Sequence, residues 1–510
     1  MSSPRKIIGA IDLGASGGKF IIGIFTRDKF KVEEVYRFEN GPINLYLKTP
    51  HKTLPKMYWD DLAIYEEIIK GLKTFAKVYG EDLASLGIDT WGTDGAFYRE
   101  TGEMLDRGYN YRDHRLDTIR KEMFKILPEK KLFTLTGIPS MPFNMVNQLF
   151  WIGRYRPEIV AVANVFLPIH AIFYYYLCGA RIAEYTWLST TQLLDPFKKT
   201  WSKKVFKIFS LPLHLMPPIV MPGAKIGRLH KAIAHEIGLK PFSLVATATH
   251  DTASAYVACP VEDERKALII SSGTWSLVGK LIPEPIINDE VYESHFTNEG
   301  GVGNIRFLKN VMGTWIIQEL RRIWKEKDGK EMSWDEIVSL AKKARPFYAF
   351  IDPDNNIFYN PPNMEEAIKT FCHATGQPVP QERGEILRIT YEGLALKYVV
   401  VNEMIERLTG NKNNMVHVVG GGARNTLLNQ FTADSTGLPV LAGPEEATAI
   451  GNIMVQAISD GLVSSIKEGR KLIRASFPMK EYKPQNNRIW RAALSNFKKV
   501  ISKIKERNYD

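Results

Sequence analysis

The sequence predicts an α/β fold organised as two large domains. Strand-like and helix-like patterns alternate in both halves of the chain, which is typical of this fold class. With 510 residues, of which 45% are hydrophobic, the chain is too long for a single core. A strand–turn–strand pattern near the N-terminus also returns over residues 267–281. We therefore expect a duplicated architecture, with domains over residues 1–250 and 251–510 and a ligand held between the two halves.

Composition and charge narrow the function classes. The net charge is +11, but the lysines are spread among glutamates, and no basic arm or helix-turn-helix signature is present. A diffuse positive field suits an anionic small ligand at least as well as a nucleic acid. The three cysteines are far apart and lack CxxC pairing, which favours a reducing, cytoplasmic setting without a zinc site. The first residues lead into a strand and show no signal-peptide pattern.

The stretch "KIIGAIDLGASGGKFIIGIF", residues 6–25, predicts a β-hairpin with a glycine-rich turn. It is not a Walker A loop, because only three residues separate Gly14 from Gly18 and Lys19 is followed by Phe. Backbone N–H groups in such a turn can hold an anion, with Ser16 and Lys19 as further donors, although an ordinary tight hairpin is the alternative. Asp12 lies inside the apolar run, and a buried carboxylate requires a partner.

The elements that follow keep the α/β alternation. We expect a helix over residues 60–80 and strands over 83–91 and 96–100. The apolar segment 162–180 predicts a buried helical segment, since Asn164, Pro168 and His170 interrupt it too often for a membrane span.

In the second half, residues 415–437 predict a strand, a triple-glycine turn and a helix that Gly437 ends. A strand over 438–443 then leads to a helix with Pro444, Glu445 and Glu446 in its first turn and Gly461 just past its end. The basic amphipathic helix over 496–510 packs by one face in our interpretation, with membrane or nucleic-acid binding as the alternative.

The segment "LVATATHDTASAYVA", residues 244–258, is the most informative single stretch. A strand pattern ends at Thr249, and His250, Asp251 and Thr252 precede an alanine-rich helix. Asp251 is then either the N-cap of that helix or a base at the carboxyl end of a strand, where α/β sites usually gather. A carboxylate suits phosphoryl transfer to a hydroxyl, because the proton moves late and a weak base that orients the hydroxyl is sufficient.

Eight motifs occur in a fixed order along the chain: "IDLGASGGK", "GIDTWGTD", "YRDHR", "HDTASA", "SSGTWSL", "FTNEGG", "FLKNVMGTWIIQE" and "VVGGGARNTLLNQFTAD…AGPEEATAIGN". Over roughly residues 7–460 this order resembles the FGGY family of carbohydrate kinases. The resemblance implies two actin-like domains of ribonuclease-H-like topology with an active-site cleft between them. It also implies an ATP- and Mg²⁺-dependent kinase that phosphorylates a sugar, without a nucleic-acid or membrane partner.

The same resemblance assigns roles to individual residues. It implies that Asp251 is the catalytic base and that Asp12 lies beside the Mg²⁺–phosphate group. The implied sugar contacts are Gly92, Asp94, His250, Thr252 and Asn310. The implied ATP contacts are Ala15, Ser16, Gly17, Gly18, Lys19, Gly273, Thr274, Gln318, Gly420, Gly421, Gly422 and Asn425.

The residues around the implied sugar site leave the substrate open. The "PFN" at residues 142–144 and the whole second half match family members that phosphorylate L-rhamnulose on its 1-hydroxyl. Thr93, Asp94 and Gly95 instead lean toward the pattern of L-fuculose kinases. L-rhamnulose is the first expectation, and L-fuculose or another ketose is the alternative. An actin-like ATPase that serves as a sugar sensor or scaffold is the alternative from a different class.

Overall fold

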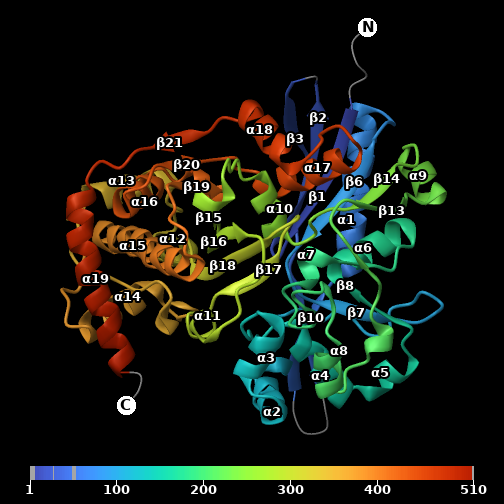
Figure 1. The fold of residues 1–510 in the computed structure, drawn as a ribbon, viewed down its shortest axis with the longest axis horizontal. Helices are drawn as coiled ribbons and strands as arrows, with labels where there is room; N and C mark the ends of the chain where they lie inside the picture. Colours follow the sequence, from blue (N-terminus) through green and yellow to red (C-terminus); the bar gives the residue numbers. More distant parts are fainter. Residues whose placement is uncertain (1–5, 27, 49–52, 508–510) are drawn as a thin grey trace. The chain divides into compact units, whose positions relative to one another are not determined.

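The computed structural model describes residues 6–26, 28–48 and 53–507 (Figure 1). Its residues group into two compact units. The first comprises Met1–Pro260, Leu281–Phe307 and Ala447–Phe477, and the second comprises Val261–Lys280, Leu308–Glu446 and Pro478–Asp510. This grouping differs from a single division after residue 250, because two later segments pack with the first unit. The chain therefore passes between the units several times.

The first unit is built on a six-stranded sheet of order β13-β14-β6-β1-β2-β3. Strands β1, β2 and β3 are antiparallel neighbours, whereas β1 pairs in parallel with β6 and β6 with β14. The bounds are β1 (Lys6–Gly14), β2 (Gly17–Phe25), β3 (Phe30–Glu39), β6 (Ser85–Thr90), β13 (Ala224–Arg228) and β14 (Ser243–Ala246). The hairpin predicted over residues 6–25 is confirmed, with Gly14 paired with Gly17 across its turn.

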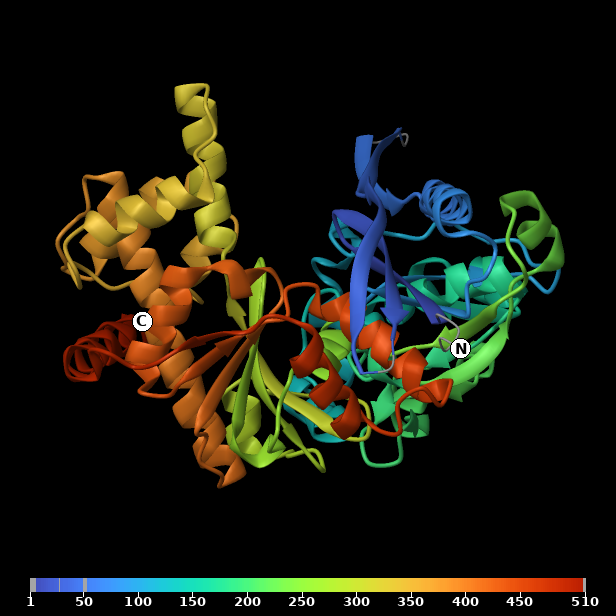
Figure 2. The ribbon, with the colours of Figure 1, turned by 90° about the horizontal axis from the view of Figure 1, so that it is seen from above.

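Helices cover both faces of this sheet. Helix α1 (Asp61–Tyr79) packs Phe75 against Phe20 of β2, which confirms the helix predicted from its apolar periodicity. Helix α17 (Ala447–Ser459) covers the other face, where its Ile453 lies against Gly23. Figure 2 shows these two helices on opposite sides of the first sheet. Helix α10 (Asp251–Ala258) packs closely on α17.

The first unit contains further elements. They are β4 (Pro42–Lys48), β5 (Thr53–Trp59), β7 (Gly95–Tyr98), α2 (Ile119–Ile126), α3 (Glu129–Thr136), α4 (Met145–Tyr155), α5 (Pro157–Val162), β8 (Val165–Pro168), α6 (Ile169–Cys178), β9 (Ala183–Glu184), α7 (Tyr185–Leu188), β10 (Leu194–Asp195), β11 (Thr200–Trp201), α8 (Lys203–Ile208), β12 (Ile219–Val220), α9 (Lys231–Ile237), α11 (Asp289–Glu293), β17 (Thr297–Gly300) and α18 (Ile466–Ser476).

The second unit repeats the strand arrangement of the first. Here β15 pairs antiparallel with β16 and parallel with β19, as β1 does with β2 and β6. The neighbouring order is β18-β16-β15-β19-β20-β21, which confirms the second hairpin. The elements are β15 (Ala267–Ser272), β16 (Trp275–Ile282), β18 (Ile305–Met312), α12 (Trp315–Asp328), α13 (Trp334–Lys343), α14 (Met364–Ala374), α15 (Arg383–Thr409), β19 (Met415–Val419), α16 (Thr426–Thr436), β20 (Val440–Ala442), β21 (Lys480–Tyr482) and α19 (Asn487–Arg507).

Two sequence-based expectations need correction. The segment 162–180 is not helical throughout: strand β8 ends at Pro168, which precedes the first residue of α6. Proline lacks an N–H donor and fits at such a junction. Pro444 and the two glutamates after it precede α17 instead of forming its first turn, because that helix begins at Ala447. Among the described residues, no helix combines the length and apolar character needed to cross a membrane.

Candidate active site

Three aspartates gather at one edge of the first sheet, where its parallel strands end. In register, Asp12 of β1 lies beside Asp89 of β6. Strand β14 leads to Thr249, whose carbonyl accepts a hydrogen bond from the Thr90 N–H at 2.8 Å, and Asp251 follows two residues later. Burial raises the pKa of Asp89, and the charges of Asp12 and Asp251 raise it further. This edge is the usual place for a ligand site in an α/β protein.

Asp89 is a member of this aspartate cluster that the sequence reasoning did not single out. It is fully buried, and Asn452 of α17 donates to its Oδ2 at 2.6 Å. Gln456, one turn later, donates to the Gly9 carbonyl at 2.7 Å and so holds α17 against β1. The available signal was the likeness of "AIDLG" to "GIDTW", since two strands with the same pattern can place their aspartates side by side.

Asp251 does not cap helix α10. The N-cap position belongs to His250, with φ −83° and ψ 121°, and Asp251 is the first helical residue. Its Oδ1 accepts hydrogen bonds from the backbone N–H and, at 3.1 Å, the hydroxyl of Thr252. The side chain keeps 36% of its surface exposed. Burial raises the pKa of Asp251, whereas the Thr252 hydrogen bonds lower it, so the carboxylate is positioned and still accessible.

His250 is held from the side opposite Asp251. Its Nδ1 lies 3.0 Å from Nη2 of Arg306, and its Nε2 lies 3.4 Å from Oδ1 of Asp251. The ring rests on Gly92, where an added Cβ would come within 2.6 Å of Nε2. Burial, followed by the charge of Arg306, keeps the pKa of His250 well below its usual range. Gly92 therefore provides the space that this histidine occupies.

Asp94, an implied sugar contact, has no exposed surface. Its oxygens accept hydrogen bonds from Trp59 at 2.7 Å and from Gln148 at 2.9 Å. Trp91 also donates, at 3.3 Å, and its ring centroid lies 4.0 Å from that of Trp59. Burial raises the pKa of Asp94 to about 6, although these donors oppose the shift. The geometry is that of a residue that fixes two indole rings, and a direct sugar contact stays a prediction.

The first hairpin presents its turn residues at the same edge as the aspartates. Lys19 lies opposite Asp12 in the register of β1 and β2, and Ser16 at the turn is exposed. Asn40 supports the turn from behind: its N–H donates to the Ser16 carbonyl at 3.3 Å and its Nδ2 to the Gly14 carbonyl at 3.1 Å. The turn thus has a fixed backbone and an open tip.

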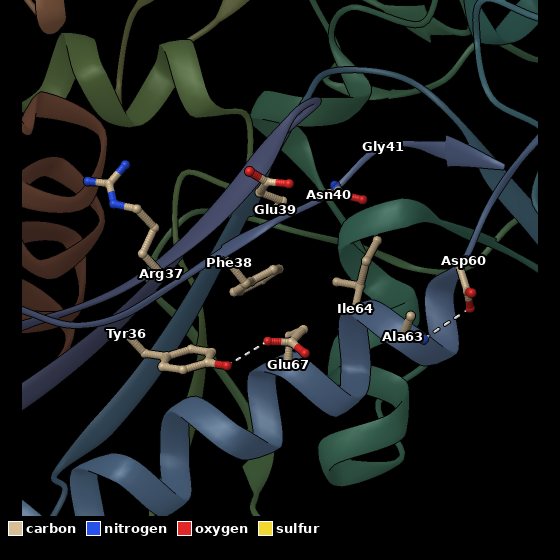
Figure 3. Close-up of a pocket in the computed structure, with 10 residues that line it drawn as sticks. All are labelled: Tyr36, Arg37, Phe38, Glu39, Asn40, Gly41, Asp60, Ala63, Ile64 and Glu67. Carbon is tan, nitrogen blue, oxygen red and sulfur yellow. Dashed lines mark hydrogen bonds between the residues drawn. The ribbon is translucent and has the colours of Figure 1, made fainter.

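A cavity of about 420 Å³ lies behind this hairpin, between β3 and α1 (Figure 3). Its lining includes Asn40 but none of the residues predicted to bind ATP or sugar. Figure 3 shows that Glu67 accepts from Tyr36 and that Asp60 accepts from Ala63, so these polar groups are paired with each other. The cavity and the aspartate edge are therefore separate features of this unit.

In the second unit, the turn of β15 and β16 brings three predicted ATP contacts together. Thr314 donates to the Gly273 carbonyl at 2.8 Å through its hydroxyl, and Gln318 donates to that hydroxyl at 3.2 Å. The Thr274 hydroxyl lies 3.4 Å from Oε1 of Gln318. Asn310 lies on β18 with an exposed side chain. Gly273, Thr274 and Gln318 thus form one cluster.

The triple glycine joins β19 to the 3₁₀ turn before α16. A Cβ at Gly422 would come within 2.0 Å of the Ser272 hydroxyl, so close packing requires glycine there. Gly421 differs, because no atom of the described chain lies within 4 Å of its added Cβ. Asn425 is the N-cap of α16: its Oδ1 accepts from the Leu428 N–H at 3.0 Å. Of the three glycines, Gly421 is the one whose added Cβ would meet no described atom beyond its own chain neighbours, which leaves room there for a ligand.

Comparisons with known proteins agree with this geometry. The FGGY family of carbohydrate kinases matches with its N-terminal domain over residues 7–258 and its C-terminal domain over residues 268–459. A rhamnulokinase of Bacteroides thetaiotaomicron is 39% identical, covering 96% of this chain and 99% of its own. One of Bacillus subtilis is 36% identical, covering 94% and 95%.

Solved structures share the fold at low identity. A xylulose kinase of Lactobacillus acidophilus has a TM-score of 0.79 at 14% identity, with 99% of this chain and 98% of that chain covered. A Plasmodium falciparum glycerol kinase with ADP has a TM-score of 0.77 at 16% identity, covering 98% of each chain. The fold is the actin-like, ribonuclease-H-like fold of sugar kinases. With both halves matched, this chain belongs to the FGGY family of carbohydrate kinases, ATP-dependent enzymes that phosphorylate sugars.

Proposed function

We propose that this kinase phosphorylates L-rhamnulose on its 1-hydroxyl, with Asp251 as the base. The carrying observation is the exposed part of the Asp251 carboxylate beside two further carboxyl groups at the strand ends. The two relatives named rhamnulokinase, which match nearly the whole chain, support this choice of sugar. Similarity that extends over both units favours a shared substrate as well as a shared reaction.

Asp251 orients the sugar hydroxyl for attack on the γ-phosphorus of ATP. The new bond joins the hydroxyl oxygen to phosphorus while the bond from phosphorus to the leaving oxygen of ADP breaks. The hydroxyl proton passes to Asp251 and then to solvent. In a loose transition state this transfer comes late, so a carboxylate is basic enough. A positioned base of this kind contributes roughly 10²- to 10⁴-fold in rate.

Asp12 and its neighbour Asp89 fit a Mg²⁺ ion. Oδ1 of Asp89 is buried without a hydrogen-bond donor in the part of the chain that the structure describes, and burial, followed by the adjacent charge of Asp12, raises the pKa of this carboxyl. A cation would offset both effects. The described residues contain no cluster of three potential metal-ligating side chains, but Mg²⁺ usually takes one or two carboxylates and completes its shell with phosphates and water. Bound there, the ion would neutralise phosphate charge.

The other site residues divide by unit. In the first, the hairpin residues 15–19 hold phosphate oxygens through their backbone N–H groups, and His250 and Thr252 contact the sugar. In the second, Gly273, Thr274, Gln318 and Gly421 contact the nucleotide, and Asn310 contacts the sugar. Asp94 acts on the sugar through the indoles that it fixes, because its carboxylate is buried.

L-fuculose is the second candidate substrate, because residues 93–95 lean toward that kinase pattern. The complete burial of Asp94 weakens the case for L-fuculose, because the Asp94 side chain then selects between sugars only through its neighbours. One changed position that lines a sugar pocket alters selectivity by about 1–3 kcal/mol.

An ADP-release assay with Mg²⁺–ATP tests the proposal across L-rhamnulose, L-fuculose, L-xylulose, D-xylulose, L-ribulose, glycerol and a blank without sugar. The strongest stimulation, measured as kcat/KM, is expected with L-rhamnulose. The Asp251→Asn variant, assayed in parallel, measures the background that does not depend on the base. A higher kcat/KM with another sugar would reassign the substrate and keep the reaction.

A further inference from the structure

The first unit contains a buried arginine that forms hydrogen bonds with two groups and an ion pair with a third. Arg306, at the start of β18, has no exposed surface. Its Nε donates to the Gly300 carbonyl at 2.9 Å, its Nη1 forms an ion pair with Oε2 of Glu299 at 3.0 Å, and its Nη2 lies 3.0 Å from Nδ1 of His250. A buried charge persists in a protein when it is paired in this way. One guanidinium therefore links β17 to the residue before the catalytic base.

The chemistry of the guanidinium fixes the proton on His250. Arginine has only donors, so the Nδ1 atom that faces Arg306 must accept. A neutral imidazole with an accepting Nδ1 carries its proton on Nε2. That Nε2 lies 3.4 Å from Oδ1 of Asp251. The histidine therefore presents an N–H donor, and not a lone pair, on the side where the base and the sugar meet.

Glu299 completes the arrangement from the other side. Its Oε2 lies 3.0 Å from Nη1 of Arg306 and 3.6 Å from Nδ1 of His250. Without Arg306, this carboxylate would remain 3.6 Å from Nδ1, and it would draw the imidazole proton to that nitrogen. The donor toward Asp251 would then be replaced by a lone pair. Arg306 contacts both groups, and its donor toward Nδ1 of His250 opposes this reversal.

We propose that Arg306 and Glu299 are positioning residues of the kinase reaction, which lock His250 in the tautomer whose Nε2–H faces Asp251 and the sugar. The proposal rests on the proposed role of Asp251 as the base. It implies that any sugar oxygen that reaches Nε2 of His250 is recognised as an acceptor. The competing interpretation is that the pair only fastens β17 to the start of α10.

A double-mutant cycle separates these interpretations. The test variant Arg306→Met/Glu299→Gln removes both charges together, so that no unpaired buried ion remains. The matched control is Arg388→Met/Glu392→Gln in α15, a largely buried pair with a 2.7 Å hydrogen bond in the second unit. Both variants are combined with His250→Ala. The readouts are kcat/KM for the best sugar of the panel, KM for ATP, and Tm.

We expect the test variant to lose about 10- to 100-fold in kcat/KM for the sugar, the range seen when partners that orient a metal-bound histidine are removed. KM for ATP should change by less than about twofold, and the control variant should lower Tm without this loss. In the His250→Ala background the test substitutions should add less than about twofold. The proposal would be overturned if the test substitutions lowered kcat/KM by the same factor in His250→Ala as in the wild type. It would also be overturned if the test variant kept the wild-type kcat/KM.

A second measurement does not depend on activity. The chain has 10 histidines, so a long-range ¹H–¹⁵N spectrum of ring-labelled protein is simple enough to assign His250 by its loss in His250→Ala. The wild type should show the neutral Nε2–H form, and the conservative Arg306→Lys variant should keep more of it than the test variant does. An Nδ1–H form in the wild type would refute the tautomer lock even if no sugar of the panel is phosphorylated. A wild type that shows the expected form without sugar turnover would instead contradict the proposed function alone.

Discussion

Replacing Asp251 by Asn should abolish turnover while leaving the fold intact. The fold should survive because the helix N-cap is His250, and because both hydrogen bonds from Thr252 go to Oδ1, an atom that asparagine retains. What disappears is the carboxylate that, in the proposed mechanism, accepts the hydroxyl proton. We therefore expect kcat to fall by roughly 10²- to 10⁴-fold, with a change in Tm of no more than a few degrees.

ADP release at saturating ATP and sugar measures this loss, and thermal unfolding with and without ATP measures the fold. The control is Asp60→Asn, a change of the same kind at the N-cap of α1, where Oδ1 accepts from the Ala63 N–H at 3.0 Å. This control should keep the wild-type kcat. A kcat within about threefold of wild type in Asp251→Asn would refute the role of the base, and unfolding of that variant alone would show that Asp251 is structural.

Four further substitutions test other parts of the candidate site. Gly421→Ala should raise KM for ATP without lowering Tm, because the added Cβ meets no protein atom within 4 Å. Gly422→Ala should instead lower Tm, because its Cβ would clash with the Ser272 hydroxyl. ATP titrations and thermal scans of both variants distinguish these outcomes. Asn452→Leu removes the donor to Asp89 and should reduce the free energy of unfolding by about 1–3 kcal/mol, measured by urea denaturation. Because burial raises the pKa of Asp94 to about 6, the native state binds a proton more tightly than the unfolded chain, so stability falls as the pH rises from about 4 to 6. The stability advantage of wild type over Asp94→Asn should shrink by up to about 3 kcal/mol across that range, and a constant difference would contradict the shifted pKa.

The elements that the sequence predicted correctly have local causes. The hairpin of residues 6–25 follows from two β-branched runs around a glycine turn, and α16 ends at Gly437, whose φ of 71° is the left-handed conformation that stops a helix. The expectation that was wrong for segment 162–180 concerns a stretch whose local pattern suits two kinds of element. In segment 162–180 the apolar character suits strand and helix equally, and pairing of β8 with β7 decides for a strand before Pro168. Pairing between distant strands is not encoded in a local pattern.

The residues of the candidate site show the same contrast between local sequence patterns and long-range contacts. Asp251 was singled out from its place after a strand, and the backbone of His250 was needed to exclude the N-cap interpretation, because a one-residue shift of the helix start would make Asp251 the cap. Asp89 became part of the site only through its register with Asp12. Arg306 lies 56 residues from His250 in the chain, and no spacing rule joins them. The fold brings each buried charged group to its partner. A candidate base such as Asp251 can therefore be proposed from a local sequence pattern, whereas the residues that surround it are found only in the folded chain.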